Sequence, residues 1–152
     1  MIRKWVMLVV VAGFFAATAI FAGTSVPDVV EMKNPAYEKH TRGIASFTHK
    51  KHTETYGIGC GECHHDDSGE PLTDLEYGDE VKNCIECHSI PGQPPRGKDA
   101  PKLTEAQKLE YHAEAIHENC RDCHRKYNKE KGLKRKDPGY APTTCSQCHP
   151  KE

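Results

Sequence analysis

The sequence predicts a small domain of mostly irregular backbone, with short α-helices and room for a short β-hairpin near its N-terminus. Three observations support this fold class: a length of 152 residues, few apolar side chains, and cysteines that occur only in pairs. From residue 24 onward the chain has only 16 Val, Ile, Leu, Met and Phe residues. So few apolar side chains do not offset the entropy lost when a chain of this length is ordered. Something other than side chains must complete the interior.

All eight cysteines lie in four copies of one motif, in which two cysteines are separated by two residues and followed by histidine. This motif is the attachment site of c-type haem, whose vinyl groups bond to the two thiols while the adjacent imidazole binds the iron. Zinc knuckles and disulfide scaffolds also use paired cysteines. Neither of them requires a histidine after every pair.

The sequence therefore predicts a small haem-cored multihaem cytochrome with four covalently bound c-type haems (haem c, iron). The predicted attachment residues are Cys60, Cys63, Cys84, Cys87, Cys120, Cys123, Cys145 and Cys148. The predicted proximal iron ligands are His64, His88, His124 and His149. A chain this small with four haems is expected to carry electrons.

Residues 1–22 have the layout of a secretory signal peptide. Arg3 and Lys4 precede an apolar run, and small residues at Ala17 and Ala19 offer a cleavage site. The run is also just long enough to cross a bilayer, so an uncleaved anchor is the alternative. We predict export to the periplasm and a mature haem-binding domain over residues 24–152.

The charges are unevenly distributed along the chain. Residues 66–80 contain seven acids and no Lys or Arg, whereas residues 125–136 contain seven bases and one acid. Such runs are commonly solvated loops. They also favour docking of two redox partners of opposite charge. The formal net charge of −1 falls to −3 without Arg3 and Lys4, and this argues against a role in binding nucleic acid.

One helix is predicted with a clear start. Thr104 and Gln107 have the spacing of a capping box, and apolar residues recur at helical intervals as far as Ile116. We expect a helix from Thr104 to about Asn119 that leads into the third motif. A short strand is expected over residues 29–32.

The second axial ligand of each haem decides its chemistry, because methionine raises the potential and an open position admits substrate. Outside the N-terminal segment only Met32 is available, so at most one haem has a methionine ligand. Six further histidines remain for four positions: His40, His49, His52, His65, His112 and His117. Bis-histidine ligation of all four haems is therefore possible.

The arrangement Phe47-x-His49-x-x-His52, followed by the doubled His64-His65, resembles the class III cytochromes c, the tetrahaem cytochrome c3 family. The resemblance covers nearly the whole mature chain. It implies that His49 is distal to the first haem, His65 to the second and His52 to the third. The alternative is that His49 and His52 are exchanged between the first and third haems. A histidine shortly before the third motif would serve the fourth haem, and we assign His117, with His112 as the alternative.

The chain departs from many family members in two ways. All four motifs have two residues between the cysteines, whereas the second and fourth motifs of many tetrahaem members have four. Its charge is closer to the acidic, type II members than to the usual basic ones. The resemblance to type II members points to a membrane redox complex as a partner.

By resemblance, the protein is a non-enzymatic electron carrier with low-potential haems. Its donors would include a periplasmic hydrogenase, and its acceptors a membrane-bound complex of anaerobic respiration. Two alternatives remain: a multihaem reductase of an oxyanion or metal, and a membrane-anchored haem subunit of a respiratory complex. No contact with nucleic acid is expected, and membrane contact is expected only if residues 1–22 are retained.

Overall fold

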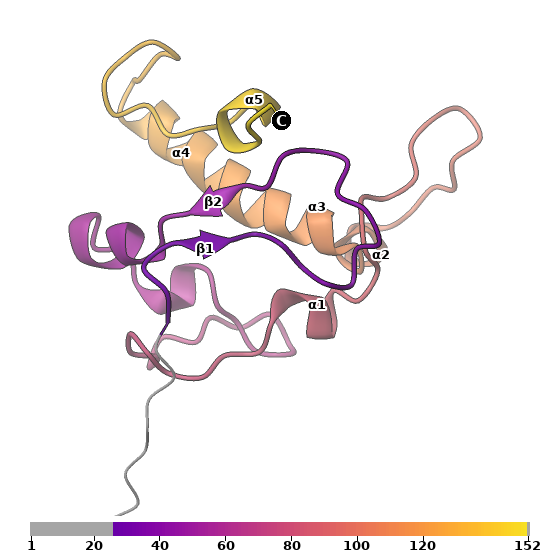
Figure 1. The fold of residues 1–152 in the computed structure, drawn as a ribbon, viewed down its shortest axis with the longest axis horizontal. Helices are drawn as coiled ribbons and strands as arrows, with labels where there is room; N and C mark the ends of the chain where they lie inside the picture. Colours follow the sequence, from indigo (N-terminus) through magenta and orange to yellow (C-terminus); the bar gives the residue numbers. More distant parts are fainter. Residues whose placement is uncertain (1–25, 152) are drawn as a thin grey trace, which may run out of the picture.

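In the computed structural model, which describes residues 26–151, short helices are joined by long loops around one small sheet (Figure 1). The elements in chain order are β1 (Val30–Glu31), β2 (Ser46–Phe47), η1 (Lys51–Thr55), η2 (Cys60–Glu62), α1 (Cys84–Cys87), α2 (Glu105–Leu109), α3 (His112–His117), η3 (Glu118–Asp122), α4 (Cys123–Glu130) and α5 (Cys145–Cys148). The predicted fold class is therefore confirmed. The predicted signal segment, residues 1–22, lies outside the described residues.

The sheet consists of β1 and β2, which pair antiparallel with Val30 opposite Phe47 and Glu31 opposite Ser46. The Ser46 hydroxyl donates to the Glu31 carboxylate across the pair, with an oxygen–oxygen distance of 2.6 Å. Both strands are only two residues long, and residues 32–45 connect them. Because β2 leads directly into the turn that carries His49, the sheet sets the position of that turn.

The predicted helix from Thr104 to Asn119 is correct at its start and wrong in its continuity. The capping box is present, since the Thr104 hydroxyl accepts from the Gln107 N–H at 3.2 Å. However, α2 ends at Leu109, and Tyr111 is extended. The reason is a backbone pairing with Ile90, whose carbonyl accepts from the His112 N–H at 2.8 Å. The segment after the second motif thus interrupts the helix.

Beyond this break, α3, η3 and α4 follow one another without interruption and form the long helical rod of Figure 1. The third motif lies inside the rod, with Cys120 in the π-helical turn η3 and Cys123 at the start of α4. A π-helical turn also forms η1, which carries His52. Such turns inside helices are frequent at functional sites.

Within residues 26–151, no hydrophobic side chain is buried, and the two buried polar or charged residues are His112 and Asn128. Asn128 holds the loop after α4 against the helix: its amide donates to the Ala141 carbonyl and accepts from the Ala141 N–H, at 2.9 and 2.8 Å. In the same residues, no helix is long and apolar enough to span a bilayer. Side chains alone give this fold no apolar core.

Candidate haem-binding sites

Each of the four motif histidines faces one other histidine. The distances between ring centroids are 6.4 Å for His49 and His64, 5.8 Å for His65 and His88, 6.2 Å for His52 and His124, and 6.1 Å for His117 and His149. The structure thus brings together all eight histidines predicted as iron ligands, in the pairs that the resemblance implied.

The spacing of these pairs suits two imidazoles on opposite sides of one metal ion. An imidazole nitrogen binds a transition metal at about 2.0–2.1 Å, and the ring centre lies roughly 1.1 Å further away. Two such rings therefore have centroids about 6 Å apart. The measured distances of 5.8–6.4 Å fall around this value. Each pair can hold a haem iron, and ligation itself stays a prediction.

The first and third sites share one short segment of chain. His49 and His52 lie three residues apart, and Phe47 packs against both rings with centroid distances of 5.6 and 4.7 Å. The third motif is also tied to the first, because the Asn119 amide donates to the Cys63 carbonyl at 3.1 Å. The two sites are therefore neighbours.

Backbone carbonyls orient five of the eight rings through the Nδ1 atom. The distances from Nδ1 to the carbonyl oxygen are 2.8 Å for His52 and Thr48, 2.7 Å for His65 and Asp66, 2.5 Å for His88 and Leu109, 2.7 Å for His124 and Pro142, and 2.8 Å for His149 and Gly43. A carbonyl only accepts, so each of these rings carries its hydrogen on Nδ1. That tautomer leaves Nε2 free to bind metal.

The fourth site uses His117, and His112 has a different environment. The Nδ1 atom of His117 lies 2.8 Å from the Gln93 side-chain amide. His112 is buried and lies with its Nδ1 atom 2.9 Å from the Tyr37 hydroxyl. The geometry therefore favours His117 as the distal ligand of the fourth haem. His40, the remaining histidine, stacks on Tyr37 with centroids 5.3 Å apart.

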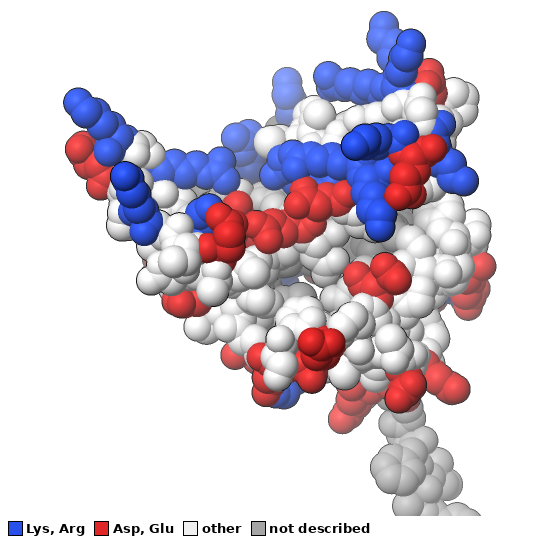
Figure 2. All heavy atoms as spheres, turned by 180° about the vertical axis from the view of Figure 1, so that it is seen from behind, with Lys and Arg blue, Asp and Glu red and all other residues white. Residues whose placement is uncertain are grey.

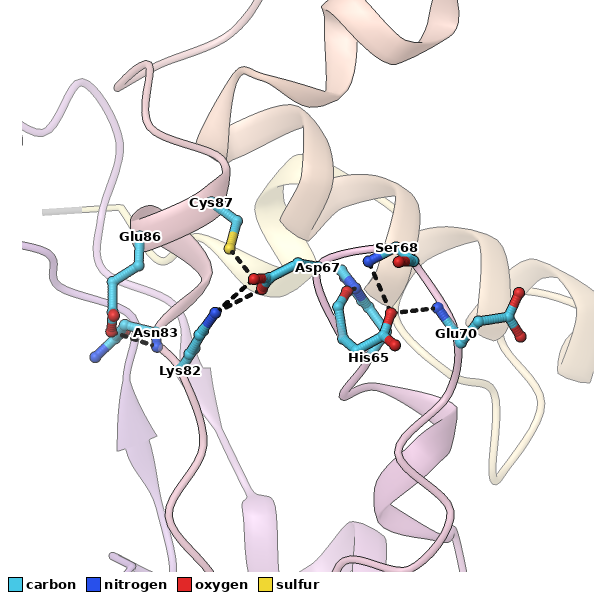
Figure 3. A network of polar contacts seen from close by, with 9 residues as sticks. His65, Asp67, Ser68, Glu70, Lys82, Asn83, Glu86 and Cys87 are labelled. Carbon is cyan, nitrogen blue, oxygen red and sulfur yellow. Dashed lines mark hydrogen bonds and ion pairs between the residues drawn. The ribbon is translucent and has the colours of Figure 1, made fainter.

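The loop that carries His65 is fastened to the second motif (Figure 3). The Asp66 carboxylate accepts from the N–H groups of Ser68 and Glu70, which closes a tight turn after His65. Asp67 accepts from the Lys82 ammonium at 2.7 Å and from the Cys87 thiol at 3.6 Å. Because haem attachment would consume the Cys87 thiol, the Asp66 turn and the Lys82–Asp67 pair are the contacts that hold His65 opposite the histidine of the second motif.

Lys82 and Asp67 also affect each other's protonation. A hydrogen bond and ion pair with Lys82 lower the pKa of Asp67. Both side chains are exposed, so solvent screens the pair and it adds little to stability. The Lys82–Asp67 pair therefore serves mainly to position the loop that carries His65.

The protonation of two further histidines suits metal binding. Burial lowers the pKa of His64, with His49 and His65 as weaker causes. Burial likewise lowers the pKa of His117, with Arg121 as the next cause. Both rings are thereby held in the neutral form that binds a metal ion.

All eight motif cysteines are free thiols. Cys120 is exposed as a residue, but its sulfur is partly desolvated, and this raises its pKa to about 11, with repulsion from Cys63 as the next cause. Electrostatic interaction also links Cys63 with Cys123 and Cys84, and Cys120 with Cys148. The Cys120 sulfur therefore interacts electrostatically with one thiol of each of the other three motifs.

The alternatives that use paired cysteines find no counterpart in the described part of the chain. No disulfide forms among the eight motif cysteines. Residues 26–151 contain no group of three or more His, Cys, Asp or Glu side chains arranged to hold a metal ion. A zinc ribbon requires four such ligands around one ion.

Sequence reasoning missed several residues that position these sites. Gly43 supplies a carbonyl to the last motif, Asn128 fixes the loop that carries the Pro142 carbonyl, and Tyr77 stacks on His49 at 5.3 Å. The sequence carries no signal for these contacts, because each joins segments that are distant along the chain. For Asp66, by contrast, the Asp-x-Ser-Gly pattern of a turn was visible in the sequence.

The fold and the paired histidines define a multihaem cytochrome. A family model described as the class III cytochrome c family matches residues 27–149, and the chain belongs to this family. Class III cytochromes bind c-type haem, carry electrons, are generally not enzymes, and are typically periplasmic. A comparison with curated proteins found no match to this chain.

Proposed function

We propose that this protein carries electrons in the periplasm through four c-type haems, each held by one cysteine pair and two histidines. The proposal rests mainly on one observation: every motif histidine faces a second histidine, with ring centroids 5.8–6.4 Å apart. When bound, haem supplies one-electron redox chemistry, and two imidazole ligands without a thioether favour a low potential. The residues of this chain hold, orient and shield the four haems.

The neighbouring first and third sites support electron exchange within the molecule. His49 and His52 lie on one short turn, so the two groups that they bind are held close together. Phe47 packs against both rings, with centroid distances of 5.6 and 4.7 Å. A domain of about 130 residues keeps all four sites near one another. An electron that enters at one site is therefore able to pass to the other sites within the molecule.

We propose that the donor is a periplasmic hydrogenase and the acceptor a membrane-bound respiratory complex. Charge supports two different docking surfaces: the acidic segment 66–80 carries the second site's loop, and the basic segment 125–136 continues from the third motif. Figure 2 shows Lys and Arg gathered over the upper half of the face in view. Complementary surfaces of this kind steer encounter more than they add affinity.

The first experiment is the denatured intact mass of protein matured in a host that attaches c-type haem. We expect the mature chain plus four haems, together with a low-spin spectrum in both redox states. Binding of carbon monoxide by the reduced protein would contradict bis-histidine ligation, because it requires an open axial position. A mass that includes residues 1–22 would contradict free movement in the periplasm.

The docking part of the proposal needs a separate measurement. Charge reversal at Lys134, Arg135 and Lys136 is expected to slow electron transfer with an acidic partner at low salt, and to remove most of its dependence on ionic strength. Reversal of Lys39, Lys98 and Lys102 is the matched control. Equal effects of both triple variants would contradict a localised docking surface.

A further inference from the structure

The first haem site differs from the other three in the contacts of its imidazole Nδ1 atoms. In the second and third sites both rings donate to backbone carbonyls, and in the fourth one ring does so and the other contacts an amide. In the first site, neither His49 nor His64 forms a side-chain hydrogen bond with any residue in 26–151. The Nδ1 atom of His49 is buried as well as unpartnered.

Aromatic rings account for this burial. Tyr77 stacks on His49 with centroids 5.3 Å apart and an interplanar angle of 21°, and Phe47 packs against the ring at 5.6 Å. The Tyr77 hydroxyl also donates to the Val26 carbonyl at 3.3 Å, an exposed contact on which the stacking of the ring does not depend. Because aromatic faces offer no strong acceptor, the His49 N–H is shielded from both protein carbonyls and water. An unsatisfied buried polar group of this kind calls for a functional explanation.

A missing Nδ1 hydrogen bond alters the electron donation of an imidazole. A hydrogen bond from Nδ1 to a carbonyl raises the basicity of the ligand and stabilises the more positive, oxidised metal. A ring without this bond donates less. A dry surrounding also disfavours the extra positive charge of the oxidised state. Both effects favour the reduced state and raise the reduction potential.

We propose that the site formed by His49 and His64 has the most positive reduction potential of the four sites. Tyr77 is the positioning residue that maintains this potential, because its ring shields the His49 N–H. This inference rests on the proposed function, since it concerns haem held by these residues. Reduction there adds one electron from the donor protein and breaks no bond. No proton moves at Nδ1, which keeps its hydrogen in both states. Electrons that enter the protein therefore collect first at this site.

The test is a redox titration of the four-haem protein followed by NMR of the haem methyl signals. The first haem is identified by contacts of its substituents with the β-protons of Cys60 and Cys63. In the unaltered protein we expect it to have the highest midpoint potential. In Tyr77→Ala water reaches the His49 N–H, and the reduction equilibrium constant of this haem alone is expected to fall about tenfold, or about 59 mV for one electron.

Two matched variants isolate the effect. Tyr77→Phe keeps the stacked ring and loses only the hydroxyl, so the potentials are expected to remain unchanged. Tyr127→Ala removes a tyrosine of equal exposure, 42% for both residues. It has no ring contact with a histidine in the described chain, and it too is expected to leave the first haem unchanged. Equal shifts in Tyr77→Ala and Tyr127→Ala, or a shift of all four haems together, would overturn the proposal.

A second measurement does not depend on any variant folding. The His49 Nδ1 hydrogen of the unaltered protein is expected to exchange with solvent more slowly than that of His65, which is exposed. Fast exchange, or a first haem that is not the most positive, would refute the inference. Failure of the proposed function would instead appear as fewer than four haems or a high-spin spectrum.

Discussion

At the scale of single residues, the histidines of this chain are distinguished by what their Nδ1 atoms contact. Carbonyls orient five of them, an amide contacts His117, a tyrosine hydroxyl contacts His112, and His49 has no partner in the described chain. These contacts decide which nitrogen is free for a metal and how strongly it donates. The ten histidines of this sequence therefore have different roles, although they look alike in a composition count.

Replacement of His117 separates it from the alternative ligand, His112. His117→Ala is expected to open one axial position, so that one haem of four becomes high-spin and binds carbon monoxide when reduced. His112→Ala is expected to leave all four haems low-spin, because His112 bonds to Tyr37 rather than facing a motif histidine. Absorption spectra with and without carbon monoxide provide the measurement. Carbon monoxide binding by His112→Ala alone would reverse the assignment.

His112 also predicts a dependence of stability on pH. Burial, with His88 as a weaker cause, lowers its pKa below the ordinary 6.5. Below pH 6.5 the unfolded chain binds a proton that the folded chain resists, so the free energy of unfolding falls as the pH falls. Above pH 6.5 both states are neutral and this contribution is constant. Denaturant unfolding of His112→Asn should show a smaller loss between about pH 6.5 and 5 than the unaltered protein.

Gly43 is required by a close approach to the end of the chain. A Cβ at this position would lie 2.1 Å from the Pro150 carbonyl oxygen. Gly43→Ala must therefore displace the segment that accepts from His149, at a cost of about 1–3 kcal/mol in unfolding free energy. Gly59→Ala is the control, because nothing lies within 4 Å of its added Cβ and its φ is −67°. Equal denaturation midpoints for the two variants would contradict this reading.

At the scale of elements, the variable positions inside two motifs help to start the helices. In α1, the Glu86 carboxylate accepts from the Asn83 N–H at 2.8 Å. In α5, the Gln147 amide accepts from the Thr144 N–H at 3.2 Å. Each pair satisfies an N–H that a four-residue helix leaves open. The residues between the cysteines therefore stabilise the turn that presents the following histidine.

The capping box of α2 connects helix stability to the second site. Thr104→Ala removes the hydroxyl that accepts from Gln107 and is expected to destabilise the protein by about 1 kcal/mol. The loss also frays the helix that ends at Leu109, whose carbonyl orients His88. Thermal unfolding and the spectrum of the second haem report the two effects. Thr73→Ala, at an exposed position without a side-chain hydrogen bond in the described chain, should stay within about 0.5 kcal/mol.

At the scale of the whole molecule, the described residues contain no buried hydrophobic side chain. Long loops are fastened by small groups of polar contacts such as those of Asn128 and Asp67. These contacts fix positions but add little free energy, because a typical hydrogen bond contributes only about 1 kcal/mol net. The protein must therefore obtain most of its stability from the groups that it binds.

The chain without haem is accordingly expected to be largely unfolded. Circular dichroism of protein produced without the haem-attachment machinery should show little helix and no cooperative thermal transition, whereas the mature protein should show both. Substitution of Cys84 and Cys87 by Ser, which removes one attachment site, is expected to give an intermediate result. A haem-free chain that unfolds cooperatively would contradict this prediction.

Prediction from sequence succeeded where the chemistry is local. The haem motifs, the capping box of α2 and the strand at Val30–Glu31 each depend on residues close together in the sequence. It failed at Tyr111, where pairing with Ile90 overrides the helical periodicity of the surrounding residues. Helix propensity amounts to tenths of a kcal/mol per residue, so two backbone hydrogen bonds from a distant segment are enough to break the helix.

The sequence by itself determined the family, the type of cofactor and the set of histidines available to bind it. The cofactor follows from two thiols and an imidazole within five consecutive residues, and the family from the further pattern Phe47-x-His49-x-x-His52 with His64-His65. No fold can alter these relations along the chain. Only the tertiary structure decided that His117 and not His112 faces His149, that Gly43 orients a ring 106 positions away, and that the Nδ1 atom of His49 has no acceptor in the described chain. These relations arise where distant segments meet. The energy of such a contact depends on positions and orientations in space, and residue spacing along the chain does not specify these.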